Sequence, residues 1–243
     1  MVLILKNKPI AFVKELSLLA ITDLHLGIEF ELRKKGINVS LQLEKFLKIL
    51  EEAKKETNAK RIVVLGDVKH KVPAASAREV EYVRNFFENL SKIFEEIFIC
   101  KGNHDDMLEE ILQDYKVYGA RGFKIKDYGF FHGHAWPFSK LWNCKTWIIG
   151  HLQAAIEIRK GNFKKIEKVV IKARPKIEKG KLQEIIILPA FSDLAGNFLL
   201  NKELPSDFLF EKVIDINNLE VYLLDGSYLG KLSSLNVDSF RRK

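Results

Sequence analysis

Hydrophobic runs alternate with amphipathic segments along the first hundred residues of the chain. Three short apolar runs predict buried strands: residues 16–22, 61–65 and 96–100. Between them, residues 41–55 and 76–94 repeat apolar side chains every three to four positions, which predicts two helices, the first with Ser40 as its N-cap. The order strand, helix, strand, helix, strand predicts a parallel sheet with right-handed crossovers.

The pattern changes in the second half of the chain, where strands follow one another with little helix between them. Six apolar runs predict these strands: residues 129–132, 146–150, 155–158, 169–173, 184–188 and 220–224. The polar segment 173–183 reads as an exposed hairpin or loop. We therefore expect an α/β (α+β) fold with two packed mixed β-sheets flanked by helices, a four-layer αββα sandwich that forms one domain over residues 1–243.

Polar side chains follow five of the predicted strands at the point where each strand ends. All six histidines of the chain fall in these strand-end segments: His25, His70, His104, His132, His134 and His151. Asp23, Asp67 and Asn103 stand beside them, and a glycine accompanies each group. Because ligands bind at the carboxyl ends of strands in parallel α/β sheets, we expect these side chains to converge on one site.

Composition narrows the choice of compartment and of ligand class. The formal charge of +8 favours anionic partners such as phosphates or nucleic acid. Two cysteines, Cys100 and Cys144, form neither a disulfide framework nor a zinc ribbon and suit a reducing cytoplasm. No apolar stretch approaches the ~20 residues of a membrane span, so we expect a cytoplasmic protein that is not inserted in a membrane.

The mixture of carboxylates and imidazoles is typical of a metal centre. Aspartate and neutral imidazole suit manganese, iron, zinc or nickel, and no cysteine stands near the cluster. Asp23 and His25 are two positions apart, so in an extended segment both would point the same way and grip one ion. The ligands are too many for one ion. We therefore predict two divalent ions, manganese first, with Asp67 between them.

The order of these motifs resembles the calcineurin-like metallophosphoesterase superfamily. The stretches DLHLGIEFELRKKGI and EIIILPAFSDLAGNF also look like an archaeal branch of phosphoesterases related to SbcD nucleases. The resemblance implies that Asp67 bridges two metals. The other implied ligands are Asp23 and His25 for the first metal, and Asn103, His132 and His151 for the second.

The same resemblance assigns two further histidines to the substrate. His104 would act as proton donor to the leaving oxygen or stabilise charge there. His70 matches the position of a second active-site histidine in SbcD-type nucleases, which favours phosphodiester substrates, although a surface residue beside Lys69 and Lys71 would look the same.

One position departs from the pattern of the superfamily. The usual Gly-His-x-His ending reads here as Gly150-His151-Leu152-Gln153, so a neutral amide stands where a first-metal ligand is expected. Gln153 would coordinate through its oxygen as a weaker donor, or the site has decayed into that of a non-catalytic binding module. His134 would touch the phosphate, serve as an alternative ligand, or be a turn residue.

A cluster of aromatic and basic residues follows His134. The aromatic members are Trp136, Phe138, Trp142 and Trp147, and Lys140 and Lys145 lie among them. Such side chains could stack bases and hold a nucleic-acid backbone, but we expect at least half of the aromatics to be core. The first hypothesis is therefore a two-metal phosphoesterase, a hydrolase acting on phosphodiesters, with DNA or RNA as its partner. The alternatives are a catalytically weakened interaction module and a small-molecule phosphodiesterase or phosphomonoesterase.

Overall fold

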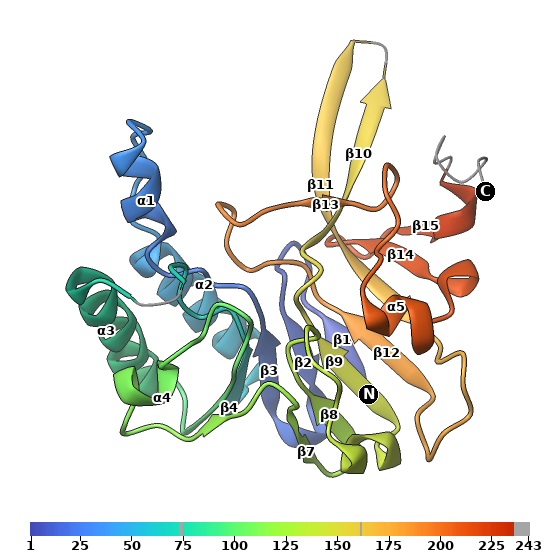
Figure 1. Cartoon of the computed structure of the whole chain (residues 1–243), viewed down its shortest axis with the longest axis horizontal. Helices are drawn as coiled ribbons and strands as arrows, with labels where there is room; N and C mark the ends of the chain where they lie inside the picture. Colours follow the sequence, from blue (N-terminus) through green and yellow to red (C-terminus); the bar gives the residue numbers. More distant parts are fainter. Residues whose placement is uncertain (73–74, 161, 236–243) are drawn as a thin grey trace.

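The first sheet gathers the strands of the N-terminal half. The computed structural model describes residues 1–72, 75–160 and 162–235. The six strands run in spatial order β1 (Val2–Ile4), β2 (Ala11–Val13), β3 (Leu18–Ile21), β4 (Arg61–Leu65), β5 (Glu96–Cys100) and β6 (Val117–Tyr118). Strands β3 to β6 are parallel, and β1 and β2 add an antiparallel edge (Figure 1). The parallel core confirms the prediction, whereas β1, β2 and β6 are too short to show a periodic pattern in the sequence.

Helices α2 (Leu43–Thr57) and α3 (Ala77–Ile93) occupy the two predicted helical segments. The hydroxyl of Ser76 caps α3 by accepting a hydrogen bond from the backbone amide of Glu79. The predicted cap of α2 is wrong, because its N-cap is Gln42, which makes no side-chain cap hydrogen bond. Two further helices, α1 (Ile28–Lys34) and α4 (Leu108–Ile111), lie in connections that follow β3 and β5.

The second sheet contains nine strands from the C-terminal half. Their bounds are β7 (Phe123–Ile125), β8 (Tyr128–Phe130), β9 (Thr146–Ile149), β10 (Ala154–Lys160), β11 (Phe163–Ala173), β12 (Glu184–Ile187), β13 (Phe198–Leu199), β14 (Glu220–Leu223) and β15 (Tyr228–Lys231). Strands β8, β9 and β12 are parallel, and most of the other pairs are antiparallel, so the sheet is mixed as expected. Residues 174–183 connect the antiparallel strands β11 and β12, as the predicted hairpin would.

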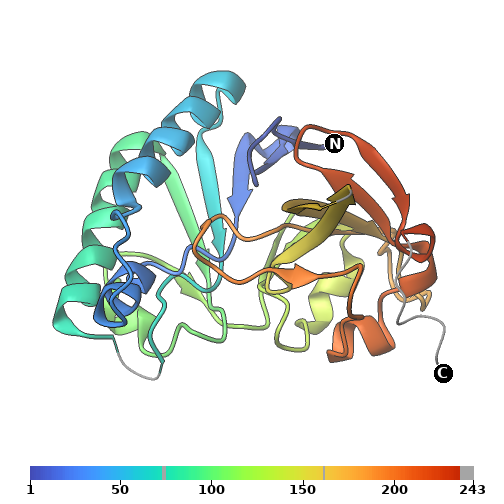
Figure 2. The same ribbon diagram turned by 90° about the horizontal axis from the view of Figure 1, so that it is seen from above.

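Successive apolar side chains along the strands of the first sheet point to opposite faces, which creates two apolar layers. In β3, Leu18 and Ala20 face the second sheet, while Leu19 and Ile21 face α2 and α3. The layer between the sheets includes Trp147 and Ile148 of β9, and the short helix α5 (Phe208–Lys212) packs Phe210 into the same core. Viewed from above, α2 and α3 cover the outer side of the first sheet and the second sheet covers its inner side (Figure 2). The αββα architecture is therefore confirmed.

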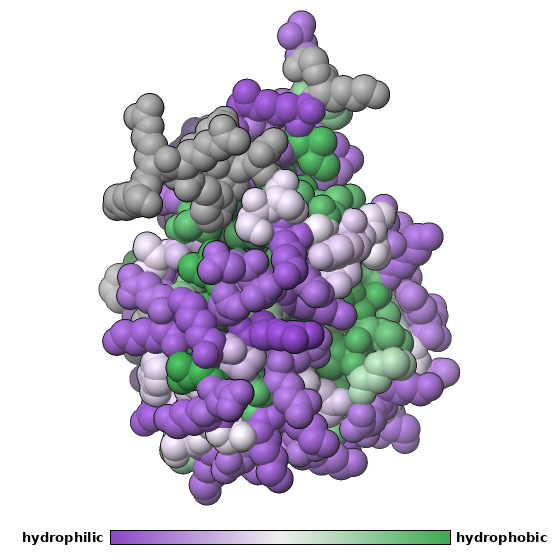
Figure 3. Space-filling view, turned by 90° about the vertical axis from the view of Figure 1, so that its right-hand side faces the viewer, coloured by the Kyte–Doolittle hydropathy of each residue, from purple (hydrophilic) through white to green (hydrophobic). Residues whose placement is uncertain are grey.

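The hairpin of β10 and β11 projects beyond the rest of the second sheet (Figures 1 and 3). Ile158, Phe163 and Ile166 are exposed on it, among charged neighbours. Within the described ranges of the chain, no helix combines the length and the apolar character that crossing a bilayer requires.

Candidate metal centre

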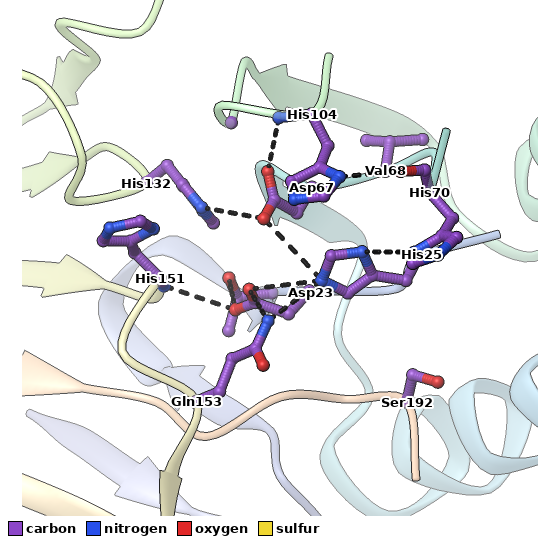
Figure 4. Close-up of polar contacts among 12 residues, drawn as sticks. Asp23, His25, Asp67, Val68, His70, His104, His132, His151, Gln153 and Ser192 are labelled. Atoms are coloured by element: carbon purple, nitrogen blue, oxygen red, sulfur yellow. Dashed lines mark hydrogen bonds and ion pairs between the residues drawn. The ribbon is translucent and has the colours of Figure 1, made fainter. Parts of the chain in front are cut away.

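The carboxyl ends of strands from both sheets meet at one place (Figure 4). Strands β3, β4 and β5 carry their polar residues at one edge of the first sheet, and β8 and β9 carry theirs at the facing edge of the second. The side chains so assembled are Asp23, His25, Asp67, His70, His104, His132, His134, His151 and Gln153. The convergence expected from the sequence is thus observed.

The backbone reaches this arrangement through left-handed conformations. Five site residues have positive φ: Asp23 (53°), His25 (45°), Asp67 (50°), His151 (69°) and Gln153 (51°). The segment is therefore not extended, so the reason given for pairing Asp23 with His25 is wrong, although both side chains do belong to one group of potential ligands. Non-glycine residues at positive φ cluster at functional sites, since the surrounding structure must hold them there.

Asp67 lies at the middle of the cluster. Its Oδ2 is 3.7 Å from Nε2 of His25 and 3.4 Å from Nε2 of His132, while its Oδ1 accepts a hydrogen bond from the backbone amide of His104 at 3.0 Å. Gly102 is required beside it, because a Cβ there would fall 2.1 Å from Oδ1. Two groups of potential ligands share Asp67, one with Asp23 and His25 and one with His132 and His151, and within each group the ligand atoms lie within 4.8 Å of one another.

The first half of the centre contains Asp23, His25 and Gln153. Oδ1 of Asp23 is 3.9 Å from Nε2 of His25. The Gln153 amide nitrogen donates to Oδ1 of Asp23 at 3.2 Å and lies 2.9 Å from Nε2 of His25. Gln153 therefore points into the site as expected, but it presents its NH₂ group to the two ligands. Its Oε1 lies against Gly196, where a Cβ would be only 2.7 Å away.

The second half contains His132 and His151. His132 is fully buried, and its Nδ1 lies 2.6 Å from the carbonyl oxygen of Leu65, which fixes the ring so that Nε2 faces Asp67. The rings of His132 and His151 are 5.0 Å apart. Asn103, the other predicted ligand, is exposed and makes no side-chain hydrogen bond within the described ranges, so its role as a ligand stays a prediction.

His70 and His104 lie together on the His25 side of Asp67. The two rings are stacked with centroids 5.9 Å apart, and His104 Nδ1 lies 2.7 Å from the carbonyl oxygen of His70. His70 Nε2 is 3.0 Å from a carboxylate oxygen of Glu31, on α1. His70 therefore faces the site and is not a detached surface residue. His134 lies on the opposite side, with its ring 5.3 Å from that of His132 and 5.9 Å from that of His151.

Burial and charge set the protonation of these groups. Burial lowers the pKa of His25 to about 4 and the pKa of His134 to about 4, and it also lowers the pKa of His151. Burial alone would raise the pKa of Asp67, but the neighbouring His132 outweighs it and holds that pKa below its usual range. The pKa of His132 is raised to about 9, because the Asp67 carboxylate outweighs the effect of burial.

Three acidic residues outside the predicted set of metal ligands and catalytic histidines support the site. Asp105 is fully buried and accepts hydrogen bonds from the backbone amides of Gly102 (2.8 Å), Val68 (2.9 Å) and Lys69 (3.2 Å). Its position in the sequence, just before the segment that reads as a short helix, predicts that Asp105 caps that helix; this is wrong, since the N-cap of α4 is Met107 and no side chain caps it. The carboxylate instead joins the loops after β4 and β5.

Glu79 and Glu31 support His70 in a similar way. The Glu79 carboxylate accepts from the backbone amides of His70 (3.1 Å) and Lys71 (2.8 Å). The spacing Ser76-x-x-Glu79 is a capping-box signal and could have marked Glu79, although its side chain turns to the β4 loop instead. Glu31 gave no signal, because α1 was not predicted.

The donor set fits divalent metal ions. Nε2 of His132 is buried, makes no hydrogen bond within the described part of the chain and lies 3.4 Å from the Asp67 carboxylate, so it faces the position that an ion beside Asp67 would take. Burial keeps His25 and His151 neutral, and neutral imidazole is the form that coordinates. Oxygen and imidazole ligands shared through one carboxylate are suited to a pair of hard or borderline cations.

Comparison with known proteins gives the chain a family. The calcineurin-like phosphoesterase family model matches residues 16–216. The crystal structure of nuclease MPE from Pseudomonas putida is similar over 93% of this chain and 96% of that chain, with 16% identity and a TM-score of 0.58. YfcE, a phosphoesterase from E. coli, matches over 88% of this chain and 96% of that chain, with 17% identity and a TM-score of 0.42. A search of curated protein sequences gives no match. Because the family model covers most of the chain and the His/Asp cluster lies where its two sheets meet, the chain belongs to the calcineurin-like phosphoesterase family, whose members are metal-dependent.

Proposed function

We propose that the chain is a dinuclear metal-dependent phosphodiesterase and that its substrate is nucleic acid. One observation carries the proposal: the Asp67 carboxylate faces His25 on one side and His132 on the other, each within 3.7 Å of Oδ2, so two ligand groups share one oxygen donor. The apolar layer shared by the two sheets supports our proposal that residues 1–243 are one catalytic domain.

The proposed ligands divide between two ions, with manganese as the first choice. Asp23, His25 and Gln153 would hold one ion, Asn103, His132 and His151 would hold the other, and Asp67 would contact both. When bound, such a pair supplies Lewis-acid charge to a phosphate and lowers the pKa of a coordinated water. The protein contributes the fixed ring of His132, the strained loops that aim Asp23 and Asp67, and a buried setting in which charges act strongly.

His104 is the proposed proton donor to the leaving oxygen. Its Nδ1 is held by the carbonyl oxygen of His70 at 2.7 Å, so Nε2 is the nitrogen that can exchange a proton with substrate. His70 lies beside it, oriented by Glu31 at 3.0 Å, and we place it on the same phosphate. His134 lies beside His132, on the opposite side of the site from His70 and His104, and is the proposed contact for a non-transferred phosphate oxygen.

His70 is the residue that favours a phosphodiester over a monoester. We extend the proposal to the SbcD-related archaeal branch on the basis of His70 and the two stretches that resemble it. The nuclease MPE structure is one case in which this fold belongs to a protein described as a nuclease.

One observation favours a second candidate, a catalytically weakened interaction module. Gln153 stands where an imidazole ligand is usual in the superfamily. Its amide nitrogen donates a hydrogen bond to Asp23 and contacts Nε2 of His25, so both potential ligands are already occupied by the amide. Such a protein would bind one ion or none and would hydrolyse nothing.

Metal analysis and hydrolysis together separate the candidates. Purified protein would be assayed for bound metal and for cleavage of bis-p-nitrophenyl phosphate with manganese, iron, zinc or nickel, beside an Asp67→Asn variant. The proposal expects two ions per chain and activity that Asp67→Asn abolishes. If the wild type hydrolyses nothing with any of these metals, the interaction module is favoured. If it prefers p-nitrophenyl phosphate or cyclic nucleotides to single-stranded DNA and RNA, a small-molecule enzyme is favoured.

A further inference from the structure

Half of the aromatic cluster that follows His134 is not core. Trp142 and Trp147 are buried, at 2% and 0% exposed, whereas Trp136 and Phe138 are each 40% exposed. Around the exposed pair lie Arg121 and Lys140, both exposed. We call Arg121, Trp136, Phe138 and Lys140 the aromatic ridge.

Backbone contacts place the ridge at the same edge as the metal centre. Phe123 of β7 pairs with Phe130 of β8 in antiparallel register, so the turn before β7 that contains Arg121 lies at the same edge of the sheet as the loop after β8 that contains His132. The amide of Phe138 donates to the carbonyl oxygen of Arg121 at 2.9 Å, which brings the two segments of the ridge together. Trp136 follows His134 by two residues, a separation of at most about 7 Å along the backbone.

Side-chain contacts hold the ridge in a defined form. The guanidinium of Arg121 lies 5.7 Å from the centre of the Phe138 ring, and Nζ of Lys140 lies 5.8 Å from it. Nε of Arg121 also donates to the carbonyl oxygen of Trp136 at 3.4 Å. The Trp136 ring leans on the buried Trp142 with centroids 6.1 Å apart, which leaves part of its surface to solvent.

The ridge carries two positive charges, on Arg121 and Lys140, that no carboxylate pairs with in the described part of the chain. Neither Arg121 nor Lys140 takes part in an ion pair within the described ranges, whereas exposed lysines such as Lys60, Lys145 and Lys165 each pair with a carboxylate. Cations fixed against an aromatic ring, beside a second and partly exposed aromatic ring, match the alternation of phosphate and base along a single strand.

We propose that the aromatic ridge binds single-stranded nucleic acid next to the scissile phosphate, with a base stacked on Trp136 and backbone phosphates on Arg121 and Lys140. This inference rests on the proposed function and names the form of its substrate. The ridge lies on the side of His132 and His134, so it would hold nucleotides beyond the phosphate at the metal centre on that side.

Paired substrates and variants test the ridge. The substrates would be a labelled single-stranded oligothymidine and bis-p-nitrophenyl phosphate, which has a single phosphate and no neighbouring nucleotides for the ridge to bind. The variants would be Trp136→Ala, Trp136→Phe and Arg121→Ala, with Phe163→Ala as control, because Phe163 is 61% exposed on the projecting hairpin. Thermal unfolding would be measured for each variant.

The ridge predicts a change in substrate ratio. Trp136→Ala should lower the ratio of oligonucleotide to small-diester cleavage by about tenfold, the size of one lost stacking contact, and Trp136→Phe should lower it by less than about threefold. Arg121→Ala should reduce the slope of log affinity against log salt by about 0.7, as expected for one lost phosphate contact on a single strand. Oligothymidine should quench tryptophan fluorescence in the wild type but not in Trp136→Phe.

Each contrary outcome is distinct. An unchanged ratio in Trp136→Ala, or an equal fall in Phe163→Ala, would overturn the ridge while the phosphodiesterase stands. Preferred binding of duplex, or no oligonucleotide binding at all, would overturn it too. If neither substrate is cleaved but oligothymidine still binds through Trp136, the proposed activity fails and the ridge is upheld as a binding surface.

Discussion

The two halves of the candidate metal centre share Asp67 and the loop after β9, but they differ in their chemistry. In the second half, the fully buried His132 turns its Nε2 towards Asp67 at 3.4 Å, and this nitrogen makes no hydrogen bond within the described residues. In the first half, the Gln153 amide already hydrogen-bonds Asp23 and approaches His25 at 2.9 Å. An ion entering there must displace these contacts and turn the amide so that its oxygen faces the metal. The difference leads us to expect that the two halves bind metal with unequal affinity, although they belong to one scaffold.

Loss of the shared carboxylate should have the largest effect. Asp67→Asn removes the charge that faces both His25 and His132, so both halves should lose metal. We expect kcat/KM for bis-p-nitrophenyl phosphate to fall by on the order of 10³-fold, since removal of one preorganised electrostatic group alone costs about 10²–10³. Asp106→Asn, at an exposed neighbour of the cluster, is the control and should stay near wild type. If Asp67→Asn keeps two ions, the two halves do not share this ligand.

Replacement of Gln153 by histidine should bring the metal affinities of the two halves closer together. Gln153→His restores an imidazole beside Asp23 and His25, and the weaker of two metal-binding steps should tighten by about tenfold or more, because changes even to the partners of metal ligands shift affinity by about 10–100-fold. Calorimetric titration of metal-free protein with manganese would measure both steps. Gln183→His, at an exposed position remote from the site, is the matched control. Two unequal steps that persist in Gln153→His would place the cause elsewhere.

The buried Asp105 carboxylate, which joins the loops after β4 and β5, should affect the pH dependence of the free energy of unfolding. Burial, and secondarily the charge of Asp67, raises the pKa of Asp105 to about 6 from its ordinary 3.8. The folded state therefore binds this proton more tightly than the unfolded state, and the resulting stabilisation is complete below about pH 4 and lost as pH rises through 6. The shift corresponds to about 3 kcal/mol.

Chemical denaturation of the metal-free protein across this range would test that contribution. Wild type should lose more stability between pH 4 and pH 6 than Asp105→Asn, which cannot titrate. The variant should also be less stable at pH 4 by about 1–3 kcal/mol, because the amide cannot accept all three backbone hydrogen bonds. Parallel pH profiles for the two proteins would contradict the assignment.

The smallest effect is expected outside both halves. Glu31→Gln weakens the pair with His70, but the Glu31 side chain is 44% exposed, so the pair is worth about 0.2–1 kcal/mol. We expect kcat/KM to fall less than about fivefold, with both metal affinities unchanged. Glu56→Gln, which breaks the exposed pair with Lys8, is the control. A change in metal affinity in Glu31→Gln would mean that His70 belongs to the metal shell.

Much of the fold follows from the spacing of apolar residues. The parallel strands and helices α2 and α3 have regular patterns long enough to be recognised, because each buries one face in a continuous apolar layer. The three-residue strands β1 and β2 and the seven-residue helix α1 are too short for periodicity to mark them. The cap of α2 was missed because Gln42 begins that helix without a side-chain hydrogen bond.

The residues of the site were easier to predict than its geometry. Histidines confined to strand ends indicated the cluster, yet the reason given for the pair Asp23 and His25 was wrong, because both residues adopt positive φ. Left-handed backbone at non-glycine residues is imposed by tertiary contacts and leaves no local signal. Asp105 and Glu31 act on backbone and side chains brought close only by folding, so their roles could not be read from neighbouring sequence.

Anomalous diffraction from a crystal soaked in manganese tests the central claim most directly. The account predicts two peaks about 3.5–4 Å apart on either side of the Asp67 carboxylate, the stronger beside His132 and His151 and the weaker beside Asp23 and His25. A single peak enclosed by His25, His70 and His104, or no peak within coordination distance of Asp67, would contradict it.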